Sequence, residues 1–494
     1  MKSEMLIKAQ EYEQLNEKRI DDAIRPSFHL SSRVGWMNDP NGFSLYEGKY
    51  HMFYQYYPYE SKWGPMYWAH AVSKDLLHWE YLPVVMAPDM PYDDFGCFSG
   101  TAITTKDGKH LLMYTCVKNH YLENGQKTEY QQQAIAIGDG LEYTKSEHNP
   151  VISTEQIPEG YSPLDFRDPK IWLGSDGIYR VLIGAMDDMH RGTILLYTSN
   201  DCINWEYKKV FAKNDGRYGR MWECPDFFVL DGKGVVIVSP QDMLPDGYEH
   251  IGGNGSLCLI GTYDEATDEF TIENTQSVDY GIDFYAPETI ATADNRRVMM
   301  GWMQNWDTII DKNHTDLYFG QMTLPRELNV INDRLYQKPI TELLSYRTNE
   351  VVYHDVEVHN EEISLDGING RTLEMDVKIR PGDVLFDRFV ITLARNASYH
   401  TTFTFTPSES LVEIDRTYAG SRRLVAHQRK AIVDDNAGCL KAKLVLDKYS
   451  IEIFINDGIK TITTTIPTPL DANQISFKAV GLVKLDVSCW ELSL

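Results

Sequence analysis

The chain has 494 residues, 43% hydrophobic and 24% charged, which is typical of a globular protein with two or three domains. Its 47 basic and 72 acidic side chains give a formal net charge of −25. So acidic a balance disfavours binding to nucleic acid or to anionic membranes, because both need basic protein surface. No apolar run reaches the roughly 18 residues of a membrane-spanning helix, so we expect no membrane partner.

The N-terminus and the cysteines predict a cytoplasmic protein. Residues 1–20 are dense in charged side chains and leave no apolar core for a signal peptide. The seven cysteines are scattered and form no Cys-x-x-Cys pair, a pattern typical of reduced thiols and not of a disulfide framework or a zinc site. The sequence also lacks a phosphate-binding nucleotide loop, and we expect neither a metal nor a cofactor.

In chain order, residues 1–25 are predicted to form an N-terminal helical extension, with a polar helix over 3–20. From about residue 30 the sequence changes to short apolar or aromatic runs separated by Gly, Pro, Asn and Asp. Runs of four to eight residues between turn residues indicate strands, and no long helical pattern interrupts them. The runs are residues 50–57, 111–117, 134–137, 179–184, 234–238 and 297–302. This part of the chain is predicted to be all-β.

Two repeats suggest how these strands are grouped. The octapeptide SKDLLHWE, from Ser73, recurs as SNDCINWE from Ser199. Five landmarks at positions 39, 98, 168, 223 and 288 are spaced by 59, 70, 55 and 65 residues, about the length of a four-stranded propeller blade with long loops. We therefore predict a five-bladed β-propeller over residues 26–338, although any long β protein can yield such spacings.

The pattern changes after a predicted linker at residues 339–349, which includes the end of a short helical run at 338–344. Apolar and polar residues then alternate with a period of two, as in 441–446. The run 451–455 leads through Asn456-Asp457-Gly458 into 460–466, which predicts a β-hairpin. We expect a second domain, a C-terminal β-sandwich, over residues 350–494.

An aromatic segment points to a carbohydrate ligand. Residues 53–68 hold eight aromatic side chains in 16 positions, against 12% in the whole chain. Aromatic faces stack on the C–H faces of sugar rings, but the inner strands of a propeller also need bulky core residues. Core packing is the better interpretation for most of them, with Trp63, in a turn rich in Gly and Pro, as the exception.

Three acidic residues lie at Pro-containing motifs in different predicted blades: Asp39, Asp168 and Glu223. Taken singly, Asp39 fits an ordinary turn, and Asp168 fits a surface ion pair with Arg167. Inner strands of a propeller converge, however, and cleavage of a glycosidic bond needs a carboxylate and a protonated acid. Glu223 stands between an indole and a thiol, a setting that disfavours the ionised carboxylate. The residues alone leave the role of each acid open.

Nine ordered motifs between residues 26 and 345 resemble glycoside hydrolase family 32, which contains the β-fructofuranosidases. They are WMNDPNG, FYQYYP, WGPMYWAHAVSKDLLHWE, CFSG, FRDPK, WECPDFF, DFYAPET, GWMQNW and MTLPREL. The resemblance implies a five-bladed propeller followed by a sandwich. It also implies retaining hydrolysis that releases terminal β-D-fructofuranosyl units from sucrose, sucrose 6-phosphate or short fructo-oligosaccharides.

By the same resemblance, Asp39 is expected to be the nucleophile, Glu223 the general acid and base, and Asp168 the transition-state stabiliser. The residues expected to bind the substrate are Trp36, Asn38, Gln55, Trp63, Phe98, Ser99, Arg167, Tyr285 and Trp306. Two positions depart from the family pattern, because Ala69 stands where Gly is frequent and Glu288 where Gln is common.

Other functions stay open at this point: a non-catalytic fructan-binding propeller, a fructosyltransferase of the same family, or an inverting pentosidase on a related propeller. A homo-oligomer is possible. The sequence does not identify the preferred fructoside. A net charge of −25 gives a phosphorylated substrate no long-range attraction, although a few local cations could still bind it.

Overall fold

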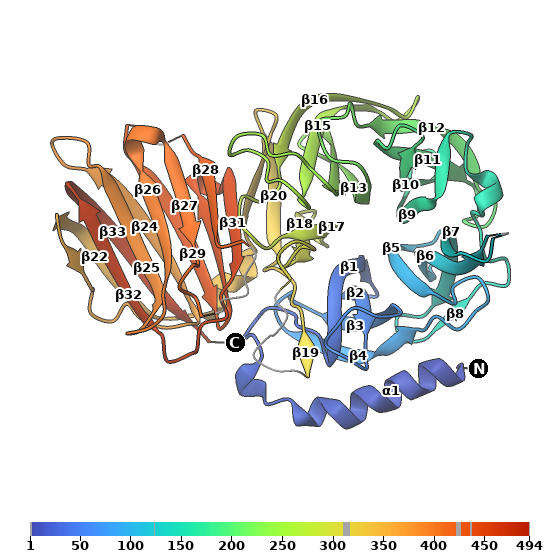
Figure 1. Ribbon diagram of the computed structural model, residues 1–494, viewed down its shortest axis with the longest axis horizontal. Coiled ribbons are helices and arrows are strands. Elements are labelled where there is room, and N and C mark those ends of the chain that lie inside the picture. Colours follow the sequence, from blue (N-terminus) through green and yellow to red (C-terminus); the bar gives the residue numbers. More distant parts are fainter. Residues whose placement is uncertain (1, 123, 310–316, 421–425, 435–436, 494) are drawn as a thin grey trace.

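The protein is described by a computed structural model that covers residues 2–122, 124–309, 317–420, 426–434 and 437–493. These residues are mostly in β-strands, which confirms the all-β prediction, and they contain one α-helix, α1 (Glu4–Asn16). Figure 1 shows a group of sheets arranged around a common centre and, beside it, two stacked sheets formed by the C-terminal part of the chain. No helix in the described ranges is long and apolar enough to cross a membrane.

The described strands before residue 340 form five antiparallel sheets, the first of which gains a short parallel strand. Sheet 1 contains β19 (Tyr318–Phe319), β1 (Gly35–Tyr46), β2 (Lys49–Tyr57), β3 (Tyr67–Ser73) and β4 (Trp79–Met86). Sheet 2 contains β5 (Gly96–Thr104), β6 (His110–Tyr121), β7 (Lys127–Gly138) and β8 (Tyr143–Lys145). Sheet 3 contains β9 (Tyr161–Leu173), β10 (Tyr179–Asp187), β11 (Gly192–Ser199) and β12 (Glu206–Lys213). Sheet 4 contains β13 (Trp222–Leu230), β14 (Lys233–Pro240), β15 (Leu257–Asp264) and β16 (Glu269–Ser277). Sheet 5 contains β17 (Tyr285–Ala291), β18 (Arg297–Trp302), β20 (Arg326–Ile331) and β21 (Arg334–Pro339).

In each of these sheets the first strand along the chain lies towards the centre of the ring and, apart from β19 beside β1, the later strands follow outward. The inner strands are therefore β1, β5, β9, β13 and β17 (Figure 1). The middle strands are buried on both faces, which explains their continuous apolar runs. On β10, for example, Val181 packs towards Leu111 of sheet 2, whereas its neighbour Leu182 packs towards Val236 of sheet 4. Every run predicted as a strand lies within one of these strands.

The repeated octapeptide forms the same turn twice. The Ser73 hydroxyl accepts the Leu76 N–H at 2.8 Å, and the Trp79 indole donates to the Leu76 carbonyl at 2.9 Å. In the second copy Ser199 and Trp205 make the equivalent bonds, to the N–H and carbonyl of Cys202, at 3.0 Å each. The sequence repeat therefore marks equivalent corners of sheets 1 and 3.

The C-terminal strands form two six-stranded sheets. One contains, in spatial order, β22 (Arg347–His359), β33 (Leu482–Leu492), β24 (Leu373–Pro381), β29 (Leu440–Asp447), β30 (Ser450–Ile455) and β31 (Lys460–Thr465). The other contains β23 (Glu362–Ile363), β32 (Gln474–Val480), β25 (Arg388–Arg395), β26 (Thr401–Thr406), β27 (Leu411–Asp415) and β28 (Gln428–Ile432). One shared apolar core joins both sheets, with Met375 and Phe477 among its buried members. The predicted hairpin is confirmed, since β30 pairs antiparallel with β31 across Asn456–Gly458.

Short 3-10 helices account for the remaining regular structure of the described chain. They are Glu17–Arg19, Asp22–Ile24, Thr154–Gln156, Thr341–Tyr346, Pro407–Glu409 and Asn456–Gly458. The helix at Thr341–Tyr346 connects the ring to the stacked sheets, where the sequence predicts a helical linker.

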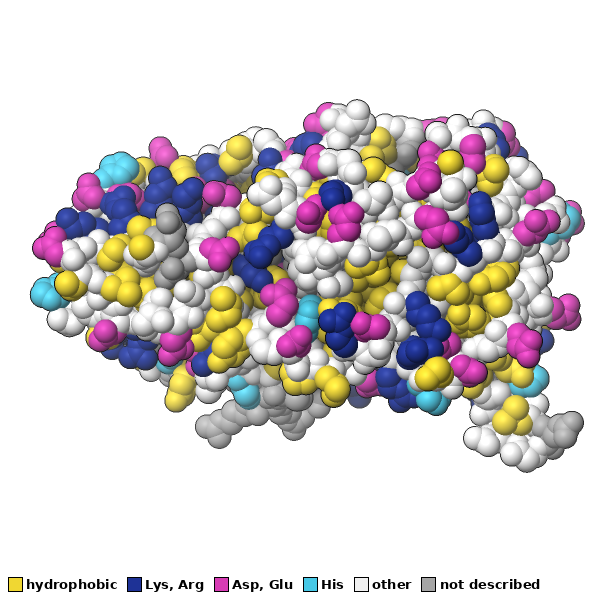
Figure 2. Space-filling view, turned by 90° about the horizontal axis from the view of Figure 1, so that it is seen from above, with side chains coloured by type: hydrophobic (Ala, Val, Ile, Leu, Met, Phe, Trp, Pro, Cys, Tyr) yellow, Lys and Arg dark blue, Asp and Glu magenta, His cyan; other side chains and the backbone are white. Residues whose placement is uncertain are grey.

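Acidic and basic side chains are interspersed over the face shown in Figure 2.

The predicted N-terminal helix is present, and α1 packs against β4 at the edge of sheet 1 (Figure 1). The Glu13 side chain accepts the Val84 N–H at 3.1 Å and lies 3.5 Å from the Arg33 guanidinium. Burial raises the pKa of Glu13 to about 7, and Arg33 partly opposes this. A charged residue of the helix is thus part of the protein interior, which a polar sequence pattern does not reveal.

Buried ion pairs join the ring to the stacked sheets. The His29 ring lies 2.8 Å from Asp447 through Nδ1 and 2.8 Å from Glu452 through Nε2, and all three side chains are buried. The Arg326 guanidinium, also buried, donates to Glu452 through Nε at 2.9 Å and to Asp279 through Nη1 at 2.9 Å. Because each charge has an opposite partner, the two parts are joined through a compensated polar interface.

Candidate active site

All five inner strands carry an irregularity in strand pairing at the position of a sequence landmark. In β1, Asn38 and Asp39 together face Gln55, and in β5 Ser99 is the extra residue between Phe98 and Gly100. The register shifts in β9, β13 and β17 fall at residues 168–169, 224–225 and 286–287. Taken singly, the Asp39 motif fits an ordinary turn, but the structure shows that it forms a β-bulge inside a strand, where the same residue types are tolerated.

The bulges of β9, β13 and β17 share a backbone conformation. Their first residues, Asp168, Cys224 and Ala286, have φ values of 63°, 48° and 47°. Non-glycine residues rarely adopt positive φ, and such strained positions cluster at functional sites. Because a bulge redirects the side chains around it, it allows an inner strand to present a polar residue to the centre of the ring.

The inner strands surround a cleft of about 350 Å³. Its lining residues are Asn38, Asp39, Gln55, Trp63, Met66, Phe98, Ser99, Gln131, Leu164, Asp165, Arg167, Asp168, Glu223, Gln241 and Trp306. The structure thus brings together the three predicted acids and seven of the nine residues predicted to bind substrate. Trp63 is 43% exposed, as expected of a residue outside the core.

Trp36 and Tyr285, the other two predicted subsite residues, lie behind this lining. Trp36 is 3% exposed, stacks on Phe319 at 4.7 Å between ring centroids, and donates its indole N–H to Asn38 Oδ1 at 2.7 Å. Tyr285 is fully buried, and its hydroxyl donates to Glu223 Oε2 at 2.6 Å. Both aromatic side chains therefore contact lining residues, and a direct contact of either with the substrate stays a prediction.

The three acids are linked through shared neighbours. Ser99 Oγ donates to Asp39 Oδ2 at 2.7 Å, and the Cys224 N–H donates to Asp168 Oδ2 at 3.0 Å. The Cys224 thiol lies 3.6 Å from Asp39 Oδ2 and 3.7 Å from Asp168 Oδ2. Cys224 directly follows Glu223 in the chain, so acids from β1, β9 and β13 surround one point.

Burial raises the pKa of two of these acids. The pKa of Asp39 is raised to about 6, first by burial and then by the nearby charge of Glu223, although the Ser99 hydrogen bond acts in the opposite direction. The pKa of Asp168 is raised to about 7 by burial and by Glu223, with Arg167 opposing. Carboxyl groups so close together cannot all ionise easily, and strongly perturbed pKa values in a cleft mark a candidate functional site.

Glu223 has two charged or polar partners that sequence reasoning did not foresee. The Arg167 guanidinium donates through Nε to Oε1 at 3.0 Å, and the Tyr285 hydroxyl contacts Oε2. The Tyr285 oxygen also lies 3.0 Å from the Ser239 carbonyl. It can donate to an ionised Glu223, or accept from a protonated Glu223 while donating to Ser239, so it fits both protonation states.

Five lining residues were not singled out in the sequence analysis: Met66, Gln131, Leu164, Asp165 and Gln241. Asp165 stands two residues before Arg167 and accepts a hydrogen bond from its Nη1 at 3.1 Å. An acidic residue at this spacing from Arg167 could therefore have identified Asp165 from the sequence. Gln131 lies on β7 and also contacts Arg167 Nη1, at 3.2 Å. No local pattern identified Gln131, because it comes from a strand that is not an inner one.

The two departures from the family pattern lie behind the cleft. Glu288 Oε2 accepts the Phe43 N–H at 2.7 Å, and Oε1 lies 3.9 Å from Lys170 Nζ. Lys170 also lies 3.3 Å from Asp226, which forms a second group of buried charges beneath the three acids. Burial raises the pKa of Glu288 to about 8, and Lys170 opposes this. Ala69 is buried in the core of sheet 1, and no contact in the structure explains the choice of alanine.

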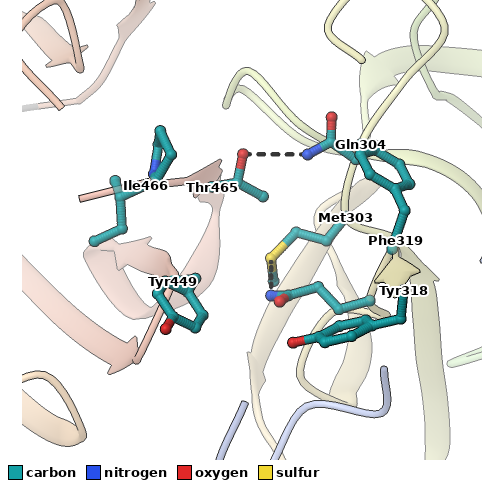
Figure 3. A pocket seen from close by; sticks show the side chains of 10 residues that line it. Met303, Gln304, Tyr318, Phe319, Tyr449, Thr465 and Ile466 are labelled. Atoms are coloured by element: carbon teal, nitrogen blue, oxygen red, sulfur yellow. Dashed lines mark hydrogen bonds between the residues drawn. The ribbon is translucent and has the colours of Figure 1, made fainter. Parts of the chain in front are cut away.

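A smaller cavity lies between the ring and the stacked sheets (Figure 3). Gln304 donates to Thr465 Oγ1 at 3.2 Å beside it, and Gln321 donates to Met303 Sδ at 3.0 Å. Its volume of about 30 Å³ suffices for a water molecule and not for a sugar. Among the described residues, no three His, Cys, Asp or Glu side chains are placed to hold a metal ion.

A cleft where several carboxyl groups meet aromatic and amide side chains is the kind of site that a glycoside hydrolase uses. Residues 29–339 match the family model described as the glycosyl hydrolases family 32 N-terminal domain, and residues 342–491 match that of the family 32 C-terminal domain. The chain belongs to glycosyl hydrolase family 32.

Curated relatives and solved structures agree with this assignment. The chain is 31% identical over 500 residues to the raffinose invertase of Escherichia coli, covering 100% of both chains. It is 32% identical over 495 residues to the sucrose-6-phosphate hydrolase of Bacillus subtilis, covering 97% of each. A variant of the Bombyx mori GH32 beta-fructofuranosidase in complex with sucrose is similar with a TM-score of 0.84 and 33% identity, covering 100% of this chain and 99% of that one.

Proposed function

We propose that this protein is a retaining β-fructofuranosidase that hydrolyses terminal β-D-fructofuranosyl units from sucrose and related saccharides. The observation that carries the proposal is that Asp39, Asp168 and Glu223, from three inner strands, line one cleft. A purely sugar-binding protein has no need of three such acids. The names of the family relatives, which include an invertase and a beta-fructofuranosidase, support the same substrate class.

In the first step we assign Asp39 as the nucleophile. Its carboxylate attacks C2 of the fructosyl unit while the C2–O bond to the leaving sugar breaks, and Glu223 transfers its proton to the departing oxygen. Ser99 holds Asp39 Oδ2, and Oδ1 has no hydrogen-bond partner among the described residues. Asp168, held by the Cys224 N–H, is assigned to bind ring hydroxyls as positive charge develops on the sugar.

In the second step the roles reverse. Glu223, now ionised, takes a proton from water, whose oxygen attacks C2 and breaks the bond to Asp39. Fructose leaves with retained configuration, and both carboxyl groups return to their starting states. Arg167 and Tyr285 stabilise the ionised Glu223 between the two steps, because both can donate hydrogen bonds to it.

The finer architecture is part of the same proposal. We assign sheets 1 to 5 as the blades of a five-bladed propeller, with residues 1–25 as the helical extension and 26–338 as the catalytic domain. Residues 339–349 are the linker, and 350–494 form the sandwich domain. The outward order of strands in each sheet supports this assignment. A cytoplasmic location is proposed from the seven cysteines, which are all free thiols.

Release of fructose from sucrose, raffinose and 1-kestose by the purified protein tests the function. The Asp39→Asn variant should lose about 10⁴-fold or more in kcat with unchanged circular dichroism, because it lacks the attacking carboxylate. ¹³C NMR of C2 in the first-formed fructose should show the β-furanose form. If no fructose is released from any of the three sugars, the proposal is wrong. If the α-anomer appears first, the retaining mechanism is wrong.

A further inference from the structure

The charges that line the cleft are mostly negative. Among its described lining residues, four are acidic, Asp39, Asp165, Asp168 and Glu223, and one is basic, Arg167. In the working state proposed above Glu223 is protonated and Asp39 ionised, so the carboxylates still balance or outnumber the single guanidinium. A bound ligand is therefore surrounded by neutral to negative potential.

The single cation is already occupied. Arg167 is 7% exposed; its Nη1 donates to Asp165, and its Nε donates to Glu223 at 3.0 Å and lies 4.0 Å from Asp168. Three carboxyl groups thus surround one guanidinium, and those that are ionised offset its charge. Burial lowers the pKa of Arg167, but these acids outweigh burial and raise it, so the guanidinium stays protonated beside them. A phosphate that approached Arg167 would have to compete with these carboxylates.

The remaining lining residues suit an uncharged sugar. Trp63 and Leu164 are 43% and 44% exposed, and they offer apolar surface on which a pyranose or furanose face can pack. Gln55, Gln131 and Gln241 can donate to and accept from sugar hydroxyls. None of these side chains carries a positive charge that would attract an anionic ligand.

From this arrangement, and resting on the proposed function, we propose that the cleft selects fructosides whose leaving group is uncharged, and that it disfavours sucrose 6-phosphate. A phosphate monoester carries about −1.5 to −2 charges at neutral pH. Its entry into a cleft rich in carboxylates costs both desolvation and repulsion. Sequence identity does not decide between the two substrates, because relatives named as sucrose-6-phosphate hydrolases are 31–32% identical to this chain and one named as an invertase is 31% identical.

The test compares kcat/KM for sucrose, raffinose and sucrose 6-phosphate at about 20 mM and 500 mM NaCl. At low salt the value for sucrose should exceed that for sucrose 6-phosphate at least tenfold. Salt screens repulsion, so the gap should narrow at 500 mM NaCl while the value for sucrose changes little. Glucose 6-phosphate should also inhibit sucrose hydrolysis less than glucose does, which measures binding without turnover.

Charge removal provides a matched pair of variants. In Asp165→Asn the ratio of kcat/KM for sucrose 6-phosphate to that for sucrose should rise about three- to tenfold, whatever loss is common to both substrates. Glu357→Gln removes one exposed carboxylate from β22, in the stacked sheets, and should leave the ratio unchanged. A structural disturbance at Asp165 would lower both values together and would not move the ratio.

The outcomes separate this inference from the proposed function. Sucrose 6-phosphate hydrolysed as efficiently as sucrose, or more so, overturns the inference and leaves the β-fructofuranosidase assignment intact. A ratio that stays constant with salt and in Asp165→Asn overturns the electrostatic cause. Absence of fructose release from sucrose, raffinose and 1-kestose removes the proposed function itself.

Discussion

Oγ of Ser99 lies 2.7 Å from Oδ2 of Asp39, so a hydroxyl from β5 donates to an acid of β1. Burial and Glu223 already raise the pKa of Asp39 to about 6, and this hydrogen bond limits the rise. In Ser99→Ala the pKa of Asp39 should rise further, and the acid limb of the kcat/KM–pH profile should move to higher pH. Loss of a hydrogen bond to a charged group, worth about 1.5–3 kcal/mol, predicts a roughly 10- to 100-fold lower kcat/KM at pH 6.

Ser44→Ala is the control for this profile. Ser44 is also buried on β1, but it bonds His110 Nε2 at 3.0 Å and the Gly42 carbonyl and does not line the cleft. It should lower stability and leave the acid limb in place. An acid limb that stays in place in Ser99→Ala would contradict the assignment of Asp39 as the group that must ionise.

Glu288 predicts a pH-dependent stability. Its pKa rises from an unfolded value near 4.5 to about 8, chiefly because it is buried. The folded state then holds the proton more tightly, so this contribution to stability is full below pH 4.5 and is lost as the pH rises to 8. When the pH is raised from 5 to 8.5, the unfolding free energy of the wild type should therefore fall by roughly 3 kcal/mol more than that of Glu288→Gln, because the glutamine side chain cannot ionise.

Urea unfolding at the two pH values measures this difference. Glu147→Gln, which removes a carboxylate whose side chain is 91% exposed, should follow the wild type at both. If Glu288→Gln also lost as much stability as the wild type on raising the pH, Glu288 would not be the responsible group.

Much of the fold was predictable because local pattern and environment agree. The run 179–184 is apolar at almost every position, since sheets on both sides bury β10. The landmarks at 39, 98, 168, 223 and 288 fall at or directly beside the five bulges, so their spacing measures the distance from one inner strand to the next. The Asp39 motif fits a turn as well as a bulge, because turns and bulges favour the same residues.

What the sequence did not predict depends on contacts between distant segments. Nothing near Glu13 indicates that it is buried against Val84, and nothing near Lys170 indicates Asp226 and Glu288 as its neighbours. Motif matching placed Trp36 and Tyr285 near the site. Whether an aromatic residue lines a cleft or lies behind it is decided by packing, which a motif does not encode.

Trp63 predicts a change in binding with little change in chemistry. Its indole lines the cleft, is 43% exposed, and meets Phe98 edge-on at 6.2 Å between centroids. Trp63→Ala removes a stacking surface that is worth about the same in the ground and transition states. KM for sucrose should rise roughly 10-fold, by about 1.4 kcal/mol, with kcat changed less than threefold. Trp63→Phe should restore most of the affinity; a fall in kcat alone would place Trp63 in the chemical step.

His29 predicts that the interface between the ring and the stacked sheets weakens in alkali. Burial alone would lower the pKa of His29, but its hydrogen bonds with Asp447 and Glu452 outweigh burial and raise the pKa to about 9. The protonated imidazole of His29 contributes fully to the free energy of unfolding below pH 6.5, and this contribution is lost as the pH rises through 9. His29→Gln should therefore be destabilised by roughly 3 kcal/mol at pH 6, and the gap to the wild type should shrink by pH 10.

Urea unfolding followed by tryptophan fluorescence at pH 6, 8 and 10 measures that gap. His78→Gln is the matched control, because His78 pairs with Asp75 through a side chain that is 53% exposed. Exposed ion pairs contribute about 0–1 kcal/mol, so this variant should differ little from the wild type at any of the three pH values. If the difference in unfolding free energy between His29→Gln and the wild type stays constant from pH 6 to pH 10, the imidazole of His29 is neutral in the interface. The two carboxylates would then need another source of positive charge, for which the buried Arg326, already bonded to Glu452, is the nearest candidate.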